Sequence, residues 1–315
     1  ILSEVVGLAS WTRRQVVVAD ASGLIHAWAT VHDRAAGRTA VELTVEAPSV
    51  VDRAGDAPLS PTALDEVPDE VLDEVAAALL AWLEAVAQAY GGERAVLQTQ
   101  LDALLDLTDD RQRRWFRAAG FHCRRTWLNM SRPVDAQAVM PGPRAGVTVR
   151  RVGVHDLGDG TTVPVAEDLQ AVHRVLEESF EDHFNSYRES FPEFAARLRE
   201  DPGHRWDHWW LALVEVDGET VVGGALVGSV LAPDDHGVEG SYIDYIGVHR
   251  RARGMGVAKA LLHTVINDAA QRGRDRVDLE VDADSPTGAD GLYRSMGWEL
   301  HHTTESWQKD LTITS

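Results

Sequence analysis

The chain has few cysteines, few lysines and no long apolar run. Its 315 residues include one cysteine, Cys123, which excludes an intrachain disulfide and a metal knuckle built from several cysteines. No stretch approaches the roughly 18 consecutive apolar residues that a membrane-spanning helix needs. Because the start of the chain has no signal-peptide pattern, we expect a cytoplasmic protein in a reducing compartment.

Basic residues are scarce relative to acidic ones. Thirty Lys and Arg residues stand against fifty Asp and Glu residues, which gives a formal net charge of −20. Such a charge repels nucleic acid and anionic membranes and favours cationic partners. We therefore expect neither nucleic acid nor membrane as a partner. At about 150 residues per domain, the length suggests two domains.

Proline and glycine gather near the middle of the chain, between residues 133 and 146. The rest of this stretch lacks helical or strand periodicity, which predicts a linker over residues 134–146. The flanking halves echo each other, since FRAAGF at 116–121 resembles YRSMGW at 293–298. Each string would end a helix at glycine and begin a strand with an aromatic residue. We predict two tandem domains, 1–133 and 147–315.

The second half alternates between strand and helix patterns. Strands are predicted at 147–152, 210–216, 220–230, 241–248 and 277–281 and from Trp298 onward, and helices at 165–200 (broken near Pro192), 257–270 and 289–296. The first half repeats the later part of this order, with strands near 15–19, 25–31, 40–46 and 95–99 and a helix over 69–90. We expect an α/β (α+β) fold in which each domain is a mixed, mostly antiparallel sheet flanked by helices.

The segment YIDYIGVHRRARGMGV at 242–257 joins a strand to an amphipathic helix through a glycine-containing turn. Gly254 and Gly256 would let a phosphate approach the backbone, and the free N–H groups of the first helical turn would face the anion. Three arginines at 250, 251 and 253 add positive charge there. A dinucleotide fingerprint is excluded because Lys259 stands where its third glycine belongs, and no P-loop Gly-Lys-Ser/Thr is present. The alternative is an ordinary glycine turn with solvated arginines.

Two motifs in this half resemble one family. Arg251-x-x-Gly254-x-Gly256 resembles the R/Q-x-x-G-x-G/A signature of GCN5-related N-acetyltransferases (GNAT), and SPTGADGLYRSMGW at 285–298 is similar to that family's N-x-x-A-x-x-L-Y-x-x-x-G-F ending. The resemblance covers residues 147–310 well and the first half in outline. The chain departs from the pattern at Ser285 and Trp298 and has one extra residue before Tyr293.

The resemblance implies an acyl-CoA site in the second domain, with acetyl-CoA as the acyl donor and no metal. The strand edge at Ile246, Gly247 and Val248 would pair with the pantetheine amides, and Ser285 would lie on the cofactor side. The residues that would hold the pyrophosphate are Arg251, Ala252, Arg253, Gly254, Met255, Gly256 and Val257.

Two residues are candidates for proton transfer. By the resemblance, Tyr293 would protonate the leaving thiolate; its alternative role is that of a packed aromatic residue. Asp244 is a carboxylate in a strand of Tyr, Ile and Val, where partial burial would raise its pKa and make it a general base. It could equally be a solvated or hydrogen-bonded strand residue. Other candidates for the base are Glu239, Asp282, Asp284 and His249.

Several other side chains are weaker candidates. His204 and His208 have helical zinc-site spacing, but no third ligand is evident, so we expect no metal. We expect Cys123 to be a small buried hydrophobic residue rather than a nucleophile. Core packing or a substrate wall could explain Trp206, Trp209 and Trp210, and analogy with the family makes further wall candidates of Phe180, His183, Phe184 and Tyr187.

The first domain lacks the cofactor signature. Residues 52–74 contain eight acids and one base, Arg53, and would repel phosphate. Phe116 stands where the second domain has Tyr293. We expect a degenerate domain that keeps the fold without the cofactor site.

The predicted function is transfer of acetyl from acetyl-CoA to an amine of a small molecule or peptide, by direct attack in a ternary complex. One alternative is an acetyltransferase similar to mycothiol synthase, a tandem group in which glutamate is expected where this chain has Tyr242. Another is a non-catalytic acyl-CoA-binding or interaction module. The sequence does not specify the oligomeric state.

Overall fold

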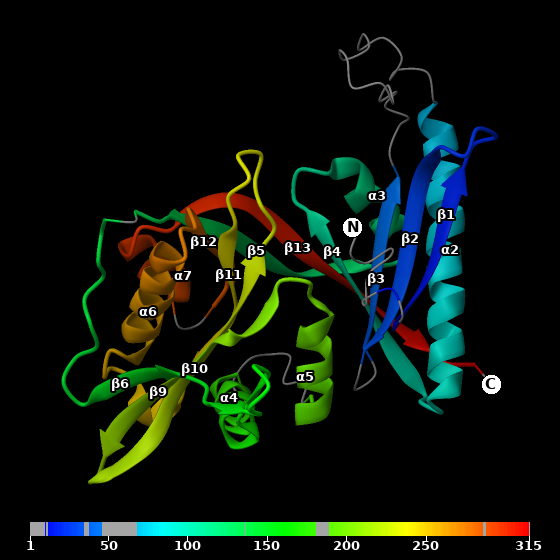
Figure 1. The fold of residues 1–315 in the computed structure, drawn as a ribbon. Helices are drawn as coiled ribbons and strands as arrows, with labels where there is room; N and C mark the ends of the chain where they lie inside the picture. Colours follow the sequence, from blue (N-terminus) through cyan, green and yellow to red (C-terminus); the bar gives the residue numbers. More distant parts are fainter. Residues whose placement is uncertain are drawn as a thin grey trace. The chain divides into compact units, whose positions relative to one another are not determined.

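The computed structural model describes residue 10 and residues 12–34, 38–45, 68–135, 137–180, 189–285 and 288–314. The chain divides into two compact units, drawn together in Figure 1. The first unit combines Ile1–Trp127 with Thr303–Ser315, and the second is Leu128–His302. Within the described residues, no helix is both long and apolar enough to cross a membrane.

The first unit is a sheet packed against a long helix. Its elements are β1 (Arg13–Ala19), β2 (Ile25–Arg34), β3 (Arg38–Val45), α2 (Asp69–Glu93), β4 (Gln98–Asp106), α3 (Asp110–Ala118) and most of β13 (Glu299–Thr312). Strands β1, β2 and β3 are antiparallel, β3 is parallel to β4, and β4 is antiparallel to β13. Helix α2 buries Leu72, Ala76, Leu79 and Leu83, whose spacing of three to four residues places them on one face.

The second unit is a larger mixed sheet with helices on both faces. Its elements are β5 (His122–Pro133, which begins in the first unit), β6 (Val147–Arg151), β7 (Val154–Asp156), β8 (Thr162–Pro164), α4 (Ala166–Ser179), α5 (Phe191–Glu200), β9 (His204–Val216), β10 (Glu219–Leu231), β11 (Gly240–Val248), α6 (Val257–Gln271), β12 (Arg276–Asp282) and α7 (Ala289–Ser295). The strand order is β5-β12-β11-β10-β9-β6. Pairing is antiparallel from β6 to β11 and parallel between β11 and β12.

Alternation along β9 separates the two faces of this sheet. Trp210, Ala212 and Val214 pack with the apolar side of α6, whereas Trp209 and Leu211 pack with α4 and α5, as period-two side chains require. A close approach of α4 explains Gly247, because a Cβ there would lie 2.9 Å from the Ser179 hydroxyl. The α6 face and the α4–α5 face are therefore both closed around β11.

The expected fold class is confirmed, since each unit has a mixed, mostly antiparallel sheet flanked by helices. The break expected near Pro192 is present, since the described part of 165–200 forms two helices, α4 and α5. The chain closes with one long strand, β13, rather than the two strands expected from the sequence.

The compact units also differ from the predicted division at 133 and 147. The last strand of the chain counts with the first unit, because Trp307 is buried among that unit's core residues. The end of β5 counts with the second unit, because Met130 is buried in the core beneath α6. The buried Trp307 thus places most of β13 in the first unit, and the buried Met130 places the end of β5 in the second.

The core beneath α6 yields a stability prediction. Leu262 is fully buried, so Leu262→Ala should lower the free energy of unfolding by about 2–5 kcal/mol through lost burial and a residual cavity. Leu157→Ala is the control, because Leu157 is 58% exposed and its change should stay within about 0.5 kcal/mol. Chemical denaturation measures both. Equal effects of the two substitutions would contradict the assignment of this core.

Candidate active site

A bulge in β11 opens the sheet of the second unit. Opposite β10, Val227 pairs with Tyr245 and Gly228 with Ile243, so Asp244 is the extra residue. The parallel ladder with β12 pairs Ser241–Ile243 with Val277–Leu279 and, in the described residues, extends no further. A bulge bends its strand and locally disrupts pairing. Beyond Asp244, β11 stays paired with β10 on one side, and its other side, which faces β12 earlier in the strand, is an edge that an extended ligand can pair with.

The glycine turn follows at the end of this edge. Both Gly254 and Gly256 have left-handed backbones, with φ of +80° and +85°, which only glycine adopts at little cost. Helix α6 starts at Val257, its first turn contains no acidic residue, and Gly256 offers no side chain to cap it. The first N–H groups of an α-helix have no intrahelical acceptor. These N–H groups at the start of α6 are available to an anion.

His249 links the glycine turn to helix α4. Its Nδ1 accepts the backbone N–H of Arg251 at 3.2 Å, and its Nε2 lies 3.2 Å from the Glu178 carboxylate on α4. Because Nδ1 is an acceptor, Nε2 carries the proton and donates to Glu178. These two contacts occupy both ring nitrogens, which makes His249 a poor candidate for the general base.

Positive charge surrounds the same turn. Arg250, Arg251 and Arg253 are exposed there. A fourth arginine, which sequence reasoning missed, comes from the predicted linker: the Cδ atom of Arg144 lies 3.2 Å from where a Cβ on Gly256 would stand. Arg144 occurs in a segment without periodicity, so no local pattern placed it near the turn.

Asp244 lies on the α5 side of the sheet. Burial is the largest cause that raises the pKa of its carboxyl, to about 7, and the negative charge of Asp201 adds to the rise. The Ser229 hydroxyl donates a hydrogen bond to it at 3.4 Å. The nearby Arg197 lowers the pKa of Asp244 only partly, because its guanidinium forms three hydrogen bonds with Glu189, at 2.9, 3.3 and 2.7 Å. A carboxyl that titrates near neutrality can accept a proton at physiological pH.

More carboxylates gather around the neighbouring Tyr242. Burial and the charges of Glu280, Asp244 and Asp278 raise the pKa of its phenol. On Asp278, Oδ1 is buried without a hydrogen-bond partner. Sequence reasoning missed Asp278 and Glu280; their alternation in β12 was the available signal, but only the parallel pairing with β11 brings them to Tyr242. This face of the sheet is acidic.

The other candidates for the base are less suitable. Glu239 is exposed and lies 3.8 Å from the Arg274 guanidinium. Asp282 is buried and accepts the backbone N–H of Asp284 at 2.9 Å, while Asp284 itself is exposed. Asp244, whose pKa burial raises to about 7, is therefore the preferred candidate.

Tyr293 on α7 is 7% exposed and packs edge-on against Trp298, with ring centroids 5.8 Å apart. The indole N–H of Trp298 donates to the Val277 carbonyl at 2.9 Å, which fixes this pair over β12. Burial raises the pKa of Tyr293 to about 12, so its hydroxyl stays protonated. The backbone N–H of Ser285 donates to the Asp282 carbonyl at 3.1 Å, at the end of β12.

The remaining candidates are mostly core residues. Trp210 and Trp209 are buried on opposite faces of β9, and the half-buried Trp206 lies 5.1 Å from Trp209. Phe180 packs 6.4 Å from the Tyr245 ring. The wall candidates His183, Phe184 and Tyr187 lie outside the described residues.

The histidine pair and the cysteine each lie in a different setting from the one the sequence suggests. His208 is held by Asp207 at 2.6 Å and by Arg274 at 2.6 Å. The described residues contain no cluster of three or more potential metal ligands. The expectation for Cys123 is wrong, because its side chain is exposed near the start of β5 rather than buried.

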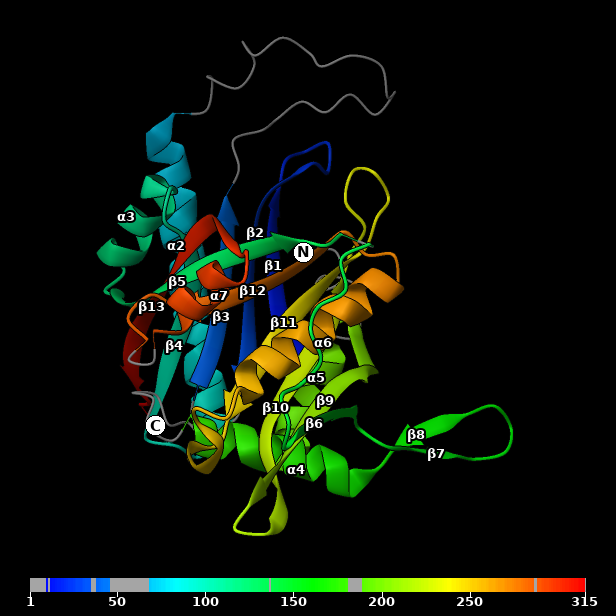
Figure 2. The same cartoon turned by 90° about the vertical axis from the view of Figure 1, so that its left-hand side faces the viewer.

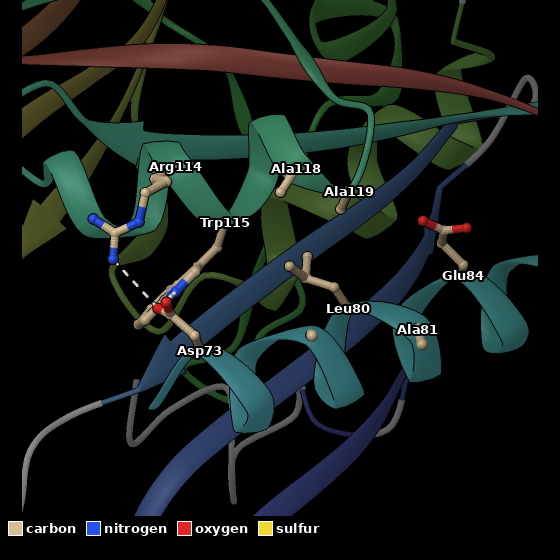
Figure 3. A pocket seen from close by; sticks show the side chains of 9 residues that line it. Asp73, Leu80, Ala81, Glu84, Arg114, Trp115, Ala118 and Ala119 are labelled. Carbon is tan, nitrogen blue, oxygen red and sulfur yellow. Dashed lines mark hydrogen bonds and ion pairs between the residues drawn. The ribbon is translucent and has the colours of Figure 1, made fainter. Parts of the chain in front are cut away.

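The first unit has a different surface at the equivalent helix. Helix α2 carries Asp69 and Glu70 in its first turn. Asp73 accepts hydrogen bonds from Arg114 and from the Trp115 indole of α3, as Figure 3 shows. These contacts line a groove of about 500 Å³ between α2 and α3. The first turn of α2 thus carries two acidic residues, whereas the first turn of α6 carries none. The acidic residues at 52–67 lie outside the described residues.

Comparison with known proteins finds one family match, which lies in the second half of the chain. Residues 169–298 match the family described as the acetyltransferase (GNAT) family, which confirms the resemblance for this part of the chain. No curated protein sequence matches the chain significantly.

Solved structures extend the likeness of fold to nearly the whole chain. A GCN5-related N-acetyltransferase from Sphaerobacter thermophilus is 22% identical, with a TM-score of 0.64 over 95% of this chain and 81% of that one. A tandem GNAT protein from the clavulanic acid biosynthesis pathway is 12% identical, with a TM-score of 0.60 over 96% and 85%. A GCN5-related N-acetyltransferase from Kribbella flavida is 15% identical, with a TM-score of 0.51 over 95% of this chain and 90% of that one. At these identities the likeness establishes the tandem fold.

The raised pKa of Asp244 predicts a pH-dependent stability. The carboxyl of Asp244 has a pKa of about 4 in the unfolded chain and of about 7 in the folded protein. Between these two pH values the folded protein keeps a proton that the unfolded chain releases, so the free energy of unfolding of the wild type falls as pH rises. Asp244→Asn removes this loss. Relative to wild type, the variant should gain stability from pH 4 to pH 8, on the order of 4 kcal/mol. Denaturant titrations at both pH values measure the gain; a difference independent of pH would contradict the shift.

Proposed function

We propose, from the premise that residues 169–298 form a domain of the acetyltransferase (GNAT) family, that the chain transfers acetyl from acetyl-CoA to an amine. The observation that carries the proposal is the open edge of β11 leading into an uncapped helix N-terminus. Exposed arginines surround that helix end in a chain of net charge −20. Along β11, backbone groups that could pair with amides are thus followed by arginines that could bind phosphates.

The chain offers acetyl-CoA two kinds of contact. The edge at Ile246, Gly247 and Val248 would hydrogen-bond the pantetheine amides as an added strand does. The turn from Arg251 to Val257 would hold the pyrophosphate through backbone N–H groups and the helix dipole. Ser285, at the end of β12, would lie on the same side. Acetyl-CoA supplies the activated acyl group as a thioester.

Asp244 is proposed as the general base. An amine is cationic at neutral pH and must lose a proton before it can attack. With a pKa of about 7, the Asp244 carboxylate would accept that proton directly or through water. The neutral nitrogen would then attack the thioester carbonyl, form the amide bond and displace the CoA sulfur.

Tyr293 is proposed as the acid that protonates this sulfur. Its pKa of about 12 keeps the hydroxyl protonated until a thiolate leaves. In water, a thiolate whose thiol has a pKa of about 8.5 would be a weak acceptor for the proton of a phenol of higher pKa. Burial raises the pKa of a thiol as well, so the two values approach each other in the same buried environment. The products are the amide and free CoA thiol. Solvent takes the proton from Asp244, and the second proton lost by the attacking nitrogen returns to Tyr293 through solvent.

The acceptor is proposed to be a cationic amine of a small molecule or peptide. Asp244, Asp278 and Glu280 lie around Tyr242, and Asp201 is near enough to influence Asp244. Carboxylates on one face favour a positively charged ligand and disfavour an anionic one. Because Tyr242 stands in place of the glutamate expected of mycothiol synthase, that function stays an alternative prediction.

The first unit is proposed to bind no acyl-CoA. At the start of α2, Asp69 forms an ion pair with Arg111 at 3.0 Å, and Asp73 is bonded by Arg114. A phosphate at the start of α2 would meet the negative charge of the acidic first turn, which the start of α6 lacks. The proposal is therefore one cofactor site per chain, with the first unit as a degenerate copy of the fold.

Binding to the turn is tested by a charge-reversed double variant. Isothermal titration of the wild type with acetyl-CoA should give one site per chain, and Arg251→Glu with Gly254→Asp should abolish binding, because it places two carboxylates at the phosphate site. The matched control is Arg174→Glu with Gly160→Asp, which makes the same charge change at an exposed arginine and at a glycine of φ +82° away from the turn. Retained binding in the first variant would refute the site.

Catalysis is tested through its pH dependence. The acid limb of kcat/KM should lie near pH 7 in the wild type and disappear in Asp244→Asn, with at least a hundredfold lower rate from loss of a general base (roughly 10²–10⁴-fold is typical). Tyr293→Phe should lower kcat while leaving CoA affinity nearly unchanged. Thiol release from acetyl-CoA with a panel of primary amines measures both. Unchanged turnover in both variants would refute the roles given to Asp244 and Tyr293, whereas no turnover by the wild type with any amine would favour the non-catalytic binding module.

A further inference from the structure

The predicted linker at 134–146 lies along helix α6, as Figure 2 shows. Near its start, the Val134 N–H donates to the Asp275 carbonyl at 2.7 Å. Met140 exchanges two hydrogen bonds with the Asn267 side chain, at 2.8 and 3.2 Å. The His263 Nδ1 lies 3.0 Å from the Pro141 carbonyl. These contacts tie the segment to α6 through specific side chains, so it does not act as a flexible linker.

The segment runs antiparallel to α6, from its C-terminal end towards its N-terminal end. Its successive partners, Asp275, Asn267 and His263, move back along the helix, and the next contact is with Gly256 at the helix start. Beyond that point the Val147 N–H donates to the Arg144 carbonyl at 3.0 Å and the chain enters β6. The backbone of Arg144 is thereby held on both sides.

The side chain of Arg144 lies over the phosphate turn. Its Cδ and Nε atoms lie 3.2 and 3.5 Å from where a Cβ on Gly256 would stand. Gly256 therefore leaves room for this side chain as well as permitting a left-handed turn. Arg144 is exposed, and none of the ion pairs between described residues includes it. A guanidinium held at a helix N-terminus can bind phosphate oxygens in a bidentate manner.

We propose that residues 134–146 form a strap that holds Arg144 at the N-terminus of α6 as a phosphate-binding residue for acyl-CoA. The inference rests on the proposed function and adds a residue that lies outside the glycine signature. CoA carries phosphate at its pyrophosphate and at its ribose 3′ position, and either could meet the guanidinium. Dephospho-CoA, which lacks the 3′-phosphate, separates the two.

The test is isothermal titration of wild type, Arg144→Ala and Arg144→Lys with CoA and with dephospho-CoA. Arg144→Ala should bind CoA at least tenfold more weakly, since a hydrogen bond to a charged group contributes about 1.5–3 kcal/mol and about 1.4 kcal/mol corresponds to tenfold. Arg144→Lys should recover part of the loss. An equal loss with dephospho-CoA assigns Arg144 to the pyrophosphate, and a loss confined to CoA assigns it to the 3′-phosphate; both support the proposal.

The strap itself is tested by Asn267→Ala, which removes the two hydrogen bonds to Met140 without touching the turn. In the wild-type background, Asn267→Ala should weaken CoA binding by about threefold, because Arg144 is then less well positioned. In the Arg144→Ala background, the same substitution should leave CoA affinity unchanged. Arg174→Ala, an exposed arginine on α4, is the control and should bind as wild type does. Wild-type binding with an unaffected Arg144→Ala would overturn this inference alone, whereas no binding by wild type would overturn the proposed function.

Discussion

The candidate site depends on one extra residue in a central strand. Asp244 has no opposite partner in the ladder between β10 and β11, and the parallel ladder to β12 ends beside it. A strand continuing in register would have kept its edge paired and placed Asp244 on a regular alternating face. The bulge instead frees the edge that leads to the glycine turn and brings a carboxylate beside it. The proposed cofactor edge and the proposed general base thus both depend on this one bulge.

Charge is distributed along β11 in a way that fits two different ligands. At its carboxyl end the helix N-terminus and Arg144, Arg250, Arg251 and Arg253 form a positive region. Around its middle, Asp244, Asp278 and Glu280 form a negative one. Phosphates and a cationic amine would each be drawn to one region and repelled from the other. The two reactants would meet between them, where Asp244 titrates near neutrality.

The sequence predicted what is encoded locally. The turn at Gly254 and Gly256 was recognisable because glycines, arginines and the start of an amphipathic helix lie within a few residues of one another. The bulge was not, because it is defined by pairing with β10. Asp278 and Glu280 joined the site only through strand pairing, and Arg144 only because its segment is tied along α6. Cys123 was misplaced because strand exposure near the start of β5 depends on what covers that strand. Long-range pairing decided each of these cases.

We propose that the open edge of β11 and the start of α6 form one acyl-CoA site in the second unit. A crystal structure of the protein with CoA tests this directly. We expect the pyrophosphate at the N–H groups beginning at Gly254, and the pantetheine arm along residues 246–248, near Asp244 and Tyr293. CoA bound instead in the groove between α2 and α3, or along α6 without contact to the glycine turn, would contradict it.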